Sequence, residues 1–138
     1  MEPRGFDAPL ALAGRVGLVA LFLPAGIGKL ANLAGVTALI ASKGLPFADA
    51  VAVATAGFEI LASLAVLAGW KTRWAALALA AFTVLAGLLF HDFWAAAAAQ
   101  RMAQQQAFFK NLGIAGGLLL LAALGPGMLS IDARRRTP

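Results

Sequence analysis

The strongest constraint on this chain is its division into four apolar segments, each near the length that crosses a lipid bilayer. They cover residues 10–31, 47–69, 74–94 and 108–124, between polar tails at 1–9 and 125–138. Lipid offers no hydrogen-bond partner to the backbone, so only helices and closed barrels cross it. The segments lack the strand-type alternation of barrels. We therefore predict an all-α membrane protein, a four-helix transmembrane bundle that forms a single domain.

The composition agrees with a membrane protein and excludes several kinds of site. Hydrophobic residues make up 62% of the chain and charged residues 12%. The absence of cysteine excludes thiolate catalysis and iron–sulfur ligation within the chain. With a single His we expect no haem or metal centre. The net charge of +5 is scattered, so we interpret it as orientation signal and lipid contact and expect no nucleic-acid partner.

The connections predict how the helices lie relative to the membrane. Leu33–Ser42 is apolar but too short to span, so we predict a short interfacial helix after the first span. Residues 95–107 are rich in Ala and Gln, and we expect them to extend the third helix out of the membrane or along its surface.

The distribution of cations predicts the orientation in the membrane. Four spans place both termini on one side. That side carries most of the basic loop and tail residues, namely Arg4, Lys71, Arg73 and Arg134 to Arg136. The other side has only Lys43 and Arg101 in its loops. The positive-inside rule therefore predicts that both termini are cytoplasmic.

Glu59 lies near the middle of the second span, about 15 Å from either surface at 1.5 Å per residue. An ionisable group at that depth costs ~3 kcal/mol or more unless it faces protein, water or another charge. Small and polar residues share its helical stripe, which predicts that it faces a helix: Ala52, Thr55, Ala56, Ala62 and Ser63. We predict Arg15 as its best partner by depth and Lys110 as the second candidate. The pair either lines a functional pocket or only locks the first two helices together.

His91 ends the third apolar segment, and Lys110 and Asn111 begin the fourth. Antiparallel helices would bring them to the same membrane surface. His91 could hydrogen-bond a quinone carbonyl and pass a proton through Asp92, or belong to an interfacial aromatic belt. Lys110 and Asn111 could bind an anionic head group or a quinone oxygen, or only snorkel and cap the helix. The candidate ligand-binding residues are Arg15, Lys29, Glu59, His91, Lys110 and Asn111.

A series of short motifs runs from Arg15 to Asp132. After Arg15 come Gly26-Ile27-Gly28-Lys29-Leu30, Gly44-Leu45-Pro46, Glu59, Gly69-Trp70-Lys71-Thr72-Arg73, Phe90-His91-Asp92-Phe93-Trp94, Lys110-Asn111 and Ser130-Ile131-Asp132. The ordered set resembles the DoxX family of small bacterial four-helix membrane proteins. The resemblance implies an inner-membrane location and a link to quinone-coupled redox chemistry, without one agreed activity.

From the residues and the resemblance together we predict a membrane subunit that supports quinone-linked redox chemistry. Because the chain has no redox centre of its own, electrons would come from a partner subunit or from a bound cofactor such as a quinone. One alternative is a non-catalytic anchor or assembly protein for a redox complex. Another is a small-solute transporter, which would need a homo-oligomer because a four-helix monomer has little room for a pore. Whether the chain is itself an enzyme stays open at this point.

Overall fold

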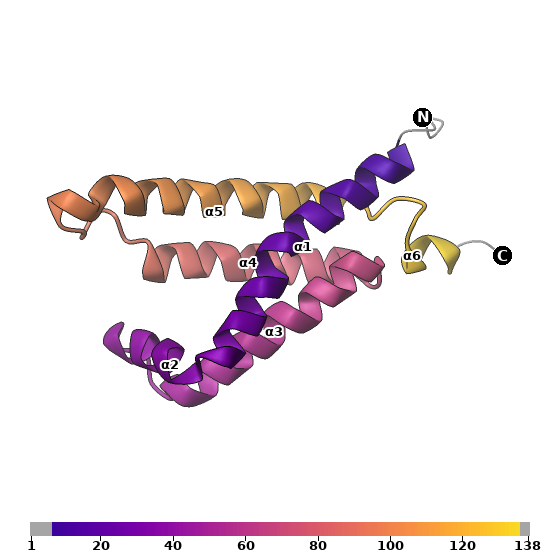
Figure 1. Cartoon of the computed structure of the whole chain (residues 1–138). Coiled ribbons are helices and arrows are strands. Elements are labelled where there is room, and N and C mark those ends of the chain that lie inside the picture. The colour runs from indigo at the N-terminus through magenta and orange to yellow at the C-terminus, as the bar shows by residue number, and fades with distance from the viewer. Residues whose placement is uncertain (1–6, 136–138) are drawn as a thin grey trace.

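The computed structural model describes residues 7–135, which form helices joined by short loops (Figure 1). The helices are α1 (Asp7–Ala31), α2 (Leu33–Ser42), α3 (Ala48–Ala68), α4 (Thr72–Phe90), α5 (Ala98–Leu124) and α6 (Ile131–Arg134). By length and composition, α1, α3, α4 and α5 could each cross a membrane. The predicted four-helix bundle is therefore confirmed, with the short helix α2 following the first long one. Arg4 and Arg136, two of the cations on which the predicted orientation rests, lie outside the described residues.

The connection between α4 and α5 differs from the prediction. The fourth helix ends at Phe90, and the fifth begins at Ala98. Turns within residues 91–96 close the connection, through hydrogen bonds from the Phe93 amide to the His91 carbonyl and from the Ala95 amide to the Asp92 carbonyl. The expectation that the Ala- and Gln-rich residues extend the third long helix is wrong, since from Ala98 onward they belong to α5. Helix propensity does not say which neighbouring helix a segment joins.

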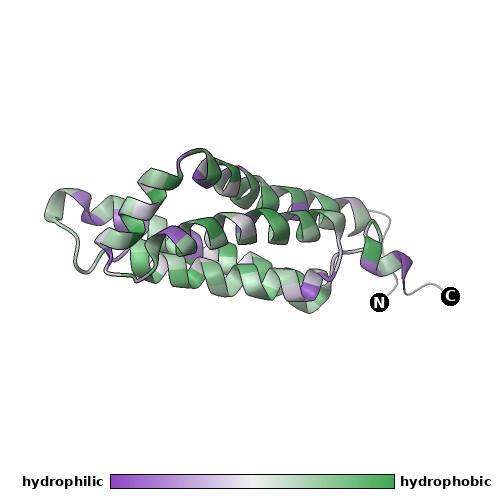
Figure 2. Ribbon diagram, turned by 90° about the horizontal axis from the view of Figure 1, so that it is seen from below, coloured by the Kyte–Doolittle hydropathy of each residue, from purple (hydrophilic) through white to green (hydrophobic). Residues whose placement is uncertain are grey.

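The long helices associate as two antiparallel pairs (Figure 1). In one pair α1 packs along α3, and in the other α4 packs along α5. A less extensive contact between α3 and α4 joins the pairs and includes the rings of Phe58 and Phe82, whose centroids are 5.3 Å apart. The long helices consist mostly of hydrophobic residues (Figure 2), and many of their large hydrophobic side chains are exposed. Such surfaces suit contact with lipid.

The buried core occupies the half of the bundle that contains the start of α1 and α6. All four long helices contribute to it, through Val19, Phe22, Ala62, Val66, Ala76, Leu79, Ala80, Ala115, Leu118 and Ala122. In the other half, the α1–α3 pair diverges from the α4–α5 pair, and α2 lies at the end of the first pair (Figure 1). We call these the core half and the open half.

Gly26 of α1 lies tightly against α3. A Cβ atom on Gly26 would lie 2.8 Å from Cγ1 of Ile60, 3.0 Å from the carbonyl oxygen of Ala56 and 3.2 Å from Cβ of Glu59. Helices in lipid gain stability from such close packing of small residues. Gly26 therefore sets the distance between α1 and α3 next to Glu59.

We expect Gly26→Ala to lower the free energy of unfolding by about 1–3 kcal/mol, because the Ala56 carbonyl is backbone and cannot rotate away. Gly28→Ala is the matched control, since no atom lies within 4 Å of a Cβ at that position. The control should leave stability unchanged or raise it slightly through helix propensity. Unfolding both variants in mixed detergent micelles tests this, and equal transition midpoints would contradict the close approach.

Candidate functional site

Glu59 forms an ion pair with Lys29 across the contact between α1 and α3. Nζ of Lys29 donates to Oε2 of Glu59 at 2.5 Å. Glu59 is 4% exposed, whereas the Lys29 side chain is 29% exposed. The prediction that Glu59 faces protein is confirmed. The pair is therefore more exposed at its ammonium group than at its carboxylate.

The predicted pairing of Arg15 with Glu59 is wrong. Arg15 is buried at the C-terminal end of α3. Its Nη1 donates to the carbonyl oxygens of Leu67 at 2.7 Å and Val66 at 3.3 Å. Its Nη2 donates to the carbonyl of Leu129. The last carbonyls of a helix have no partner within the helix, and a guanidinium has five donors to offer them. These carbonyls lie about 10 Å along α3 from Glu59, so Arg15 stabilises the helix end and Lys29 is left to pair with the acid.

The end of the bundle around Arg15 also holds the segment before and within α6. The Asp132 amide donates to the carbonyl of Gly69 at 2.8 Å. Oδ1 of Asp132 accepts from the Lys71 amide at 2.8 Å, and Oδ2 accepts from the amide and hydroxyl of Thr72 at 2.9 and 2.8 Å. Asp132 therefore caps the start of α4 from 60 residues away along the sequence. Two of the motifs in the resemblance meet here, an association that the sequence pattern did not predict.

Gly69 explains why the chain turns at this place. Its φ of +69° lies in the left-handed region, and a Cβ there would overlap Ser130 and lie 2.7 Å from Nη1 of Arg15. Ser130 caps α6 by accepting from the Ala133 amide at 3.2 Å. A glycine is therefore needed both for the backbone conformation and for the space that Arg15 and Ser130 occupy.

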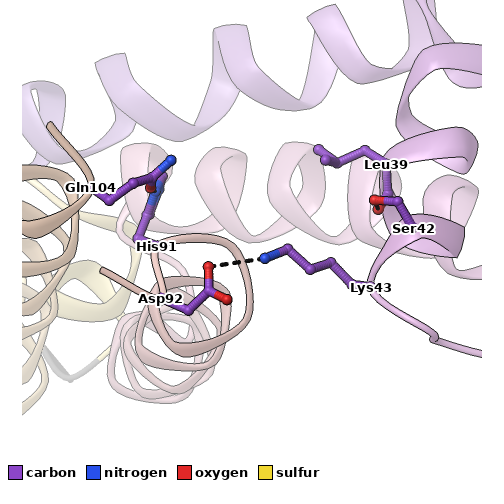
Figure 3. Close-up of polar contacts among 6 residues, drawn as sticks. All are labelled: Leu39, Ser42, Lys43, His91, Asp92 and Gln104. Carbon is purple, nitrogen blue, oxygen red and sulfur yellow. Dashed lines mark hydrogen bonds and ion pairs between the residues drawn. The ribbon is translucent and has the colours of Figure 1, made fainter. Parts of the chain in front are cut away.

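The opposite end of the bundle brings His91 and Asp92 near α2 and α5 (Figure 3). Nδ1 of His91 lies 2.9 Å from Oε1 of Gln104. An amide oxygen only accepts, so Nδ1 donates in this arrangement, and Nε2 can take up a proton or, once protonated, donate to a ligand oxygen. Asp92 accepts from Nζ of Lys43 at 3.0 Å, which ties the end of α2 to the loop before α5.

Lys110 and Asn111 lie on different sides of α5. Asn111 packs against α4, where a Cβ on Gly87 would be 3.5 Å from Nδ2 of Asn111. The hollow lined by Val84, Gly87, Phe108, Asn111 and Leu112 has a volume of about 10 Å³, which is room for about one water molecule. That hollow does not accommodate a quinone ring.

The exposed Lys110 lies on the side of α5 that is turned toward α1. It shares a helical face with Gly117, seven residues later, and a Cβ on Gly117 would be 3.5 Å from Leu18 of α1. Lys29 shares its face of α1 with Leu18, eleven residues earlier. Each lysine therefore shares a helical face with a residue at the contact between α1 and α5, although the Lys29 ammonium itself is directed to Glu59 of α3.

The structure thus divides the predicted ligand-binding residues into two groups. One group lies toward the open half and consists of Lys29, Glu59, His91, Lys110 and Asn111. Arg15 lies at the other end of the bundle, where its guanidinium donates hydrogen bonds to backbone carbonyls. Among residues 7–135 no three His, Asp or Glu side chains gather in a way that could hold a metal ion. Ligand binding by the first group stays a prediction.

We expect the Lys43–Asp92 link to weaken only in strong acid. The hydrogen bond from Lys43 is the main cause that lowers the pKa of Asp92 below the ordinary value of about 3.9. A lowered folded-state pKa means that the link contributes fully above the unfolded value and is lost as the pH falls through the folded one. Spin labels on α2 and α5 should report a widening of their separation below about pH 4. Asp92→Asn should show no such acid transition, and an identical transition in that variant would contradict the assignment.

Comparison with known proteins identifies the family to which this chain belongs. The family model of DoxX matches residues 10–92. The chain is 40% identical over 121 residues to the inner membrane protein YqjF of Escherichia coli, covering 88% of each chain. It is 30% identical over 125 residues to the inner membrane protein YphA of Escherichia coli, covering 91% of this chain and 89% of that one.

A more distant likeness covers part of the chain. The ER-derived vesicles protein ERV29 of Saccharomyces cerevisiae is 28% identical over 82 residues, which are 59% of this chain and 26% of that protein. No solved structure matches. The match over most of the long helices, together with a bundle of four bilayer-length helices, shows that this chain is a membrane protein of the DoxX family.

Proposed function

We propose that the chain is an inner-membrane subunit that supports quinone-linked redox chemistry and binds the quinone head group in the open half. The observation that carries the proposal is the Lys29–Glu59 ion pair, which is buried on its acid side and partly exposed on its lysine side. A buried charge is expensive in a membrane, and partial exposure keeps the ammonium available to a ligand that arrives through lipid. The similarity to YqjF and YphA, both inner membrane proteins, supports the location.

The side chains of the open half fit the chemistry of a quinone head group. When bound, a quinone supplies an acceptor for two electrons and two protons, and the electrons would come from a partner subunit. The Lys29 ammonium can donate a hydrogen bond to a carbonyl oxygen on one side, and Lys110 can do so from α5. Nε2 of His91 can exchange a proton with such an oxygen, while Glu59 holds the Lys29 ammonium in place. The hollow beside Asn111 is too small for the ring, so the head group would lie outside it.

The test is quinone binding to the full chain in lipid nanodiscs. We expect Lys110→Ala and His91→Ala each to weaken the affinity for a short-chain quinone about tenfold, the effect of losing one hydrogen bond to a ligand oxygen. The folded fraction should not change, because neither side chain is buried. Arg101→Ala, which removes an exposed cation from the first turn of α5, is the control and should bind normally. Unchanged affinity in both test variants would remove the proposal.

A second measurement separates this proposal from the non-catalytic anchor. Gentle purification followed by extraction should recover a quinone with the wild-type chain and less with the two variants. Co-purification of a redox partner that both variants retain, with no quinone in any sample, would favour the anchor instead.

A further inference from the structure

Exposed cations gather at the end of the bundle where α6 docks against the loop between α3 and α4. They are Lys71, Arg73, Arg134 and Arg135. Among residues 7–135, the acids at this end are Asp7 at the start of α1 and Asp132 in α6. The end therefore carries a clear excess of positive charge even before the buried Arg15 is counted.

Tertiary contacts bring these cations together. The carboxylate of Asp132 accepts from the amide of Lys71 at 2.8 Å, which holds α6 against the start of α4. Arg135 follows Asp132 by three residues and so lies on the same side of that helical turn. The charge of Asp132 is offset inside the fold, because it interacts with the amide and hydroxyl of Thr72 and electrostatically with buried Arg15. The cluster therefore keeps an excess of positive charge at the surface, although Arg73 also donates to the carbonyl of Ala122 at 2.9 Å.

Two tryptophans place this cluster at a definite depth. Trp70 is 42% exposed and Trp74 is 72% exposed, and they flank Lys71. Nζ of Lys71 lies 5.4 Å from the centroid of the Trp70 ring. Indole rings favour the head-group region of a bilayer, where one side of the ring meets hydrocarbon and the other meets water. The cations next to them therefore lie at the level of the lipid phosphates.

We propose that Lys71, Arg73, Arg134 and Arg135, with Trp70 and Trp74, form a binding surface for anionic phospholipid. The ligand is the phosphate of an acidic lipid, with its acyl chains along the apolar surface of α4. Asp132 is a positioning residue, because it keeps the tail cations beside Lys71 without contacting the lipid. The surface lies at the opposite end of the bundle from Lys29 and Glu59, so it does not depend on quinone binding.

The test uses brominated lipids, which quench tryptophans that lie beside them. In a Trp94→Phe background the remaining tryptophans are Trp70 and Trp74. With this full-length variant in bilayers, brominated phosphatidylglycerol should quench more strongly than brominated phosphatidylcholine. An acidic lipid gains about fivefold in affinity for each nearby cation. Lys71→Gln and Arg135→Gln should each reduce the preference about fivefold, and the double variant should reduce it about 25-fold.

Two controls keep the result specific. Arg101→Gln removes one charge from the opposite end and should leave the preference unchanged. Asp132→Asn removes an acid, so a purely additive charge effect would raise the preference, whereas loss of positioning would lower it. Equal quenching by the two lipids in the parent protein, or an undiminished preference in the double variant, would overturn the proposal.

Discussion

Replacing Arg15 with Met is expected to lower the free energy of unfolding by ~3 kcal/mol or more, a larger loss than we expect from any other single substitution in this chain. The guanidinium donates to the carbonyls of Val66, Leu67 and Leu129. In the variant the carbonyls of Leu67 and Leu129 lose this donor, whereas that of Val66 keeps the Gly69 amide at 3.1 Å. Each buried acceptor left without a partner costs about 1–3 kcal/mol. Asp132 also loses its buried counter-charge. The measurement is reversible unfolding in mixed micelles of dodecyl sulfate and a mild detergent.

Arg73→Met is the matched control for this prediction. Arg73 also donates to a helix-end carbonyl, that of Ala122 at 2.9 Å, but its side chain is exposed, so water can replace it. We expect a loss below about 1 kcal/mol. Comparable losses in the two variants would show that Arg15 does not hold α3, α6 and the segment between α5 and α6 together.

The second large effect concerns the Lys29–Glu59 pair. We expect Lys29→Met to lower the free energy of unfolding by about 2–3 kcal/mol, because it leaves a 4%-exposed carboxyl without its partner. The expected loss is smaller than the roughly 3–5 kcal/mol that is usual for breaking a buried pair, because the lysine is partly exposed. The measurement is the same unfolding equilibrium, combined with Glu59→Met in a double-mutant cycle.

The double variant separates a structural role from a functional one. Replacing both partners of a buried ion pair with apolar side chains is often neutral or stabilising. We therefore expect the Lys29→Met, Glu59→Met protein to recover most of the lost stability while quinone affinity stays low. If the double variant recovers quinone binding as well, the pair serves only to hold α1 and α3 together.

The sequence alone predicted the fold class and the facing of Glu59 for one reason. A bilayer admits few backbone conformations, and it penalises an isolated charge so strongly that Glu59 had to face another helix. The stripe of small residues around it identified the side of α3 that packs, and Ala52, Ala56, Ala62 and Ser63 are all buried there. The short helix after the first span followed from length alone.

The choice of partner could not be obtained from depth. Arg15 and Lys29 lie on the same face of α1, so both were available by angle. The carbonyls at the end of α3 accept hydrogen bonds from the Arg15 guanidinium, which is then not available to Glu59. This contact becomes apparent only when the structure places the carbonyls of Val66 and Leu67 beside Arg15. Similarly, the capping of α4 by Asp132 joins segments 60 residues apart, which no local pattern encodes.

What the sequence by itself determined is therefore what the solvent dictates: helices of bilayer length, their number, and which residues must avoid lipid. What only the tertiary structure decided is which polar groups meet. Pairing depends on the direction and closeness of helix packing, such as the approach that Gly26 permits between α1 and α3. The pairing of polar groups depends equally on the backbone groups at helix ends. These groups are chemically the same in every residue, so the amino-acid sequence does not indicate which side chain will bind them.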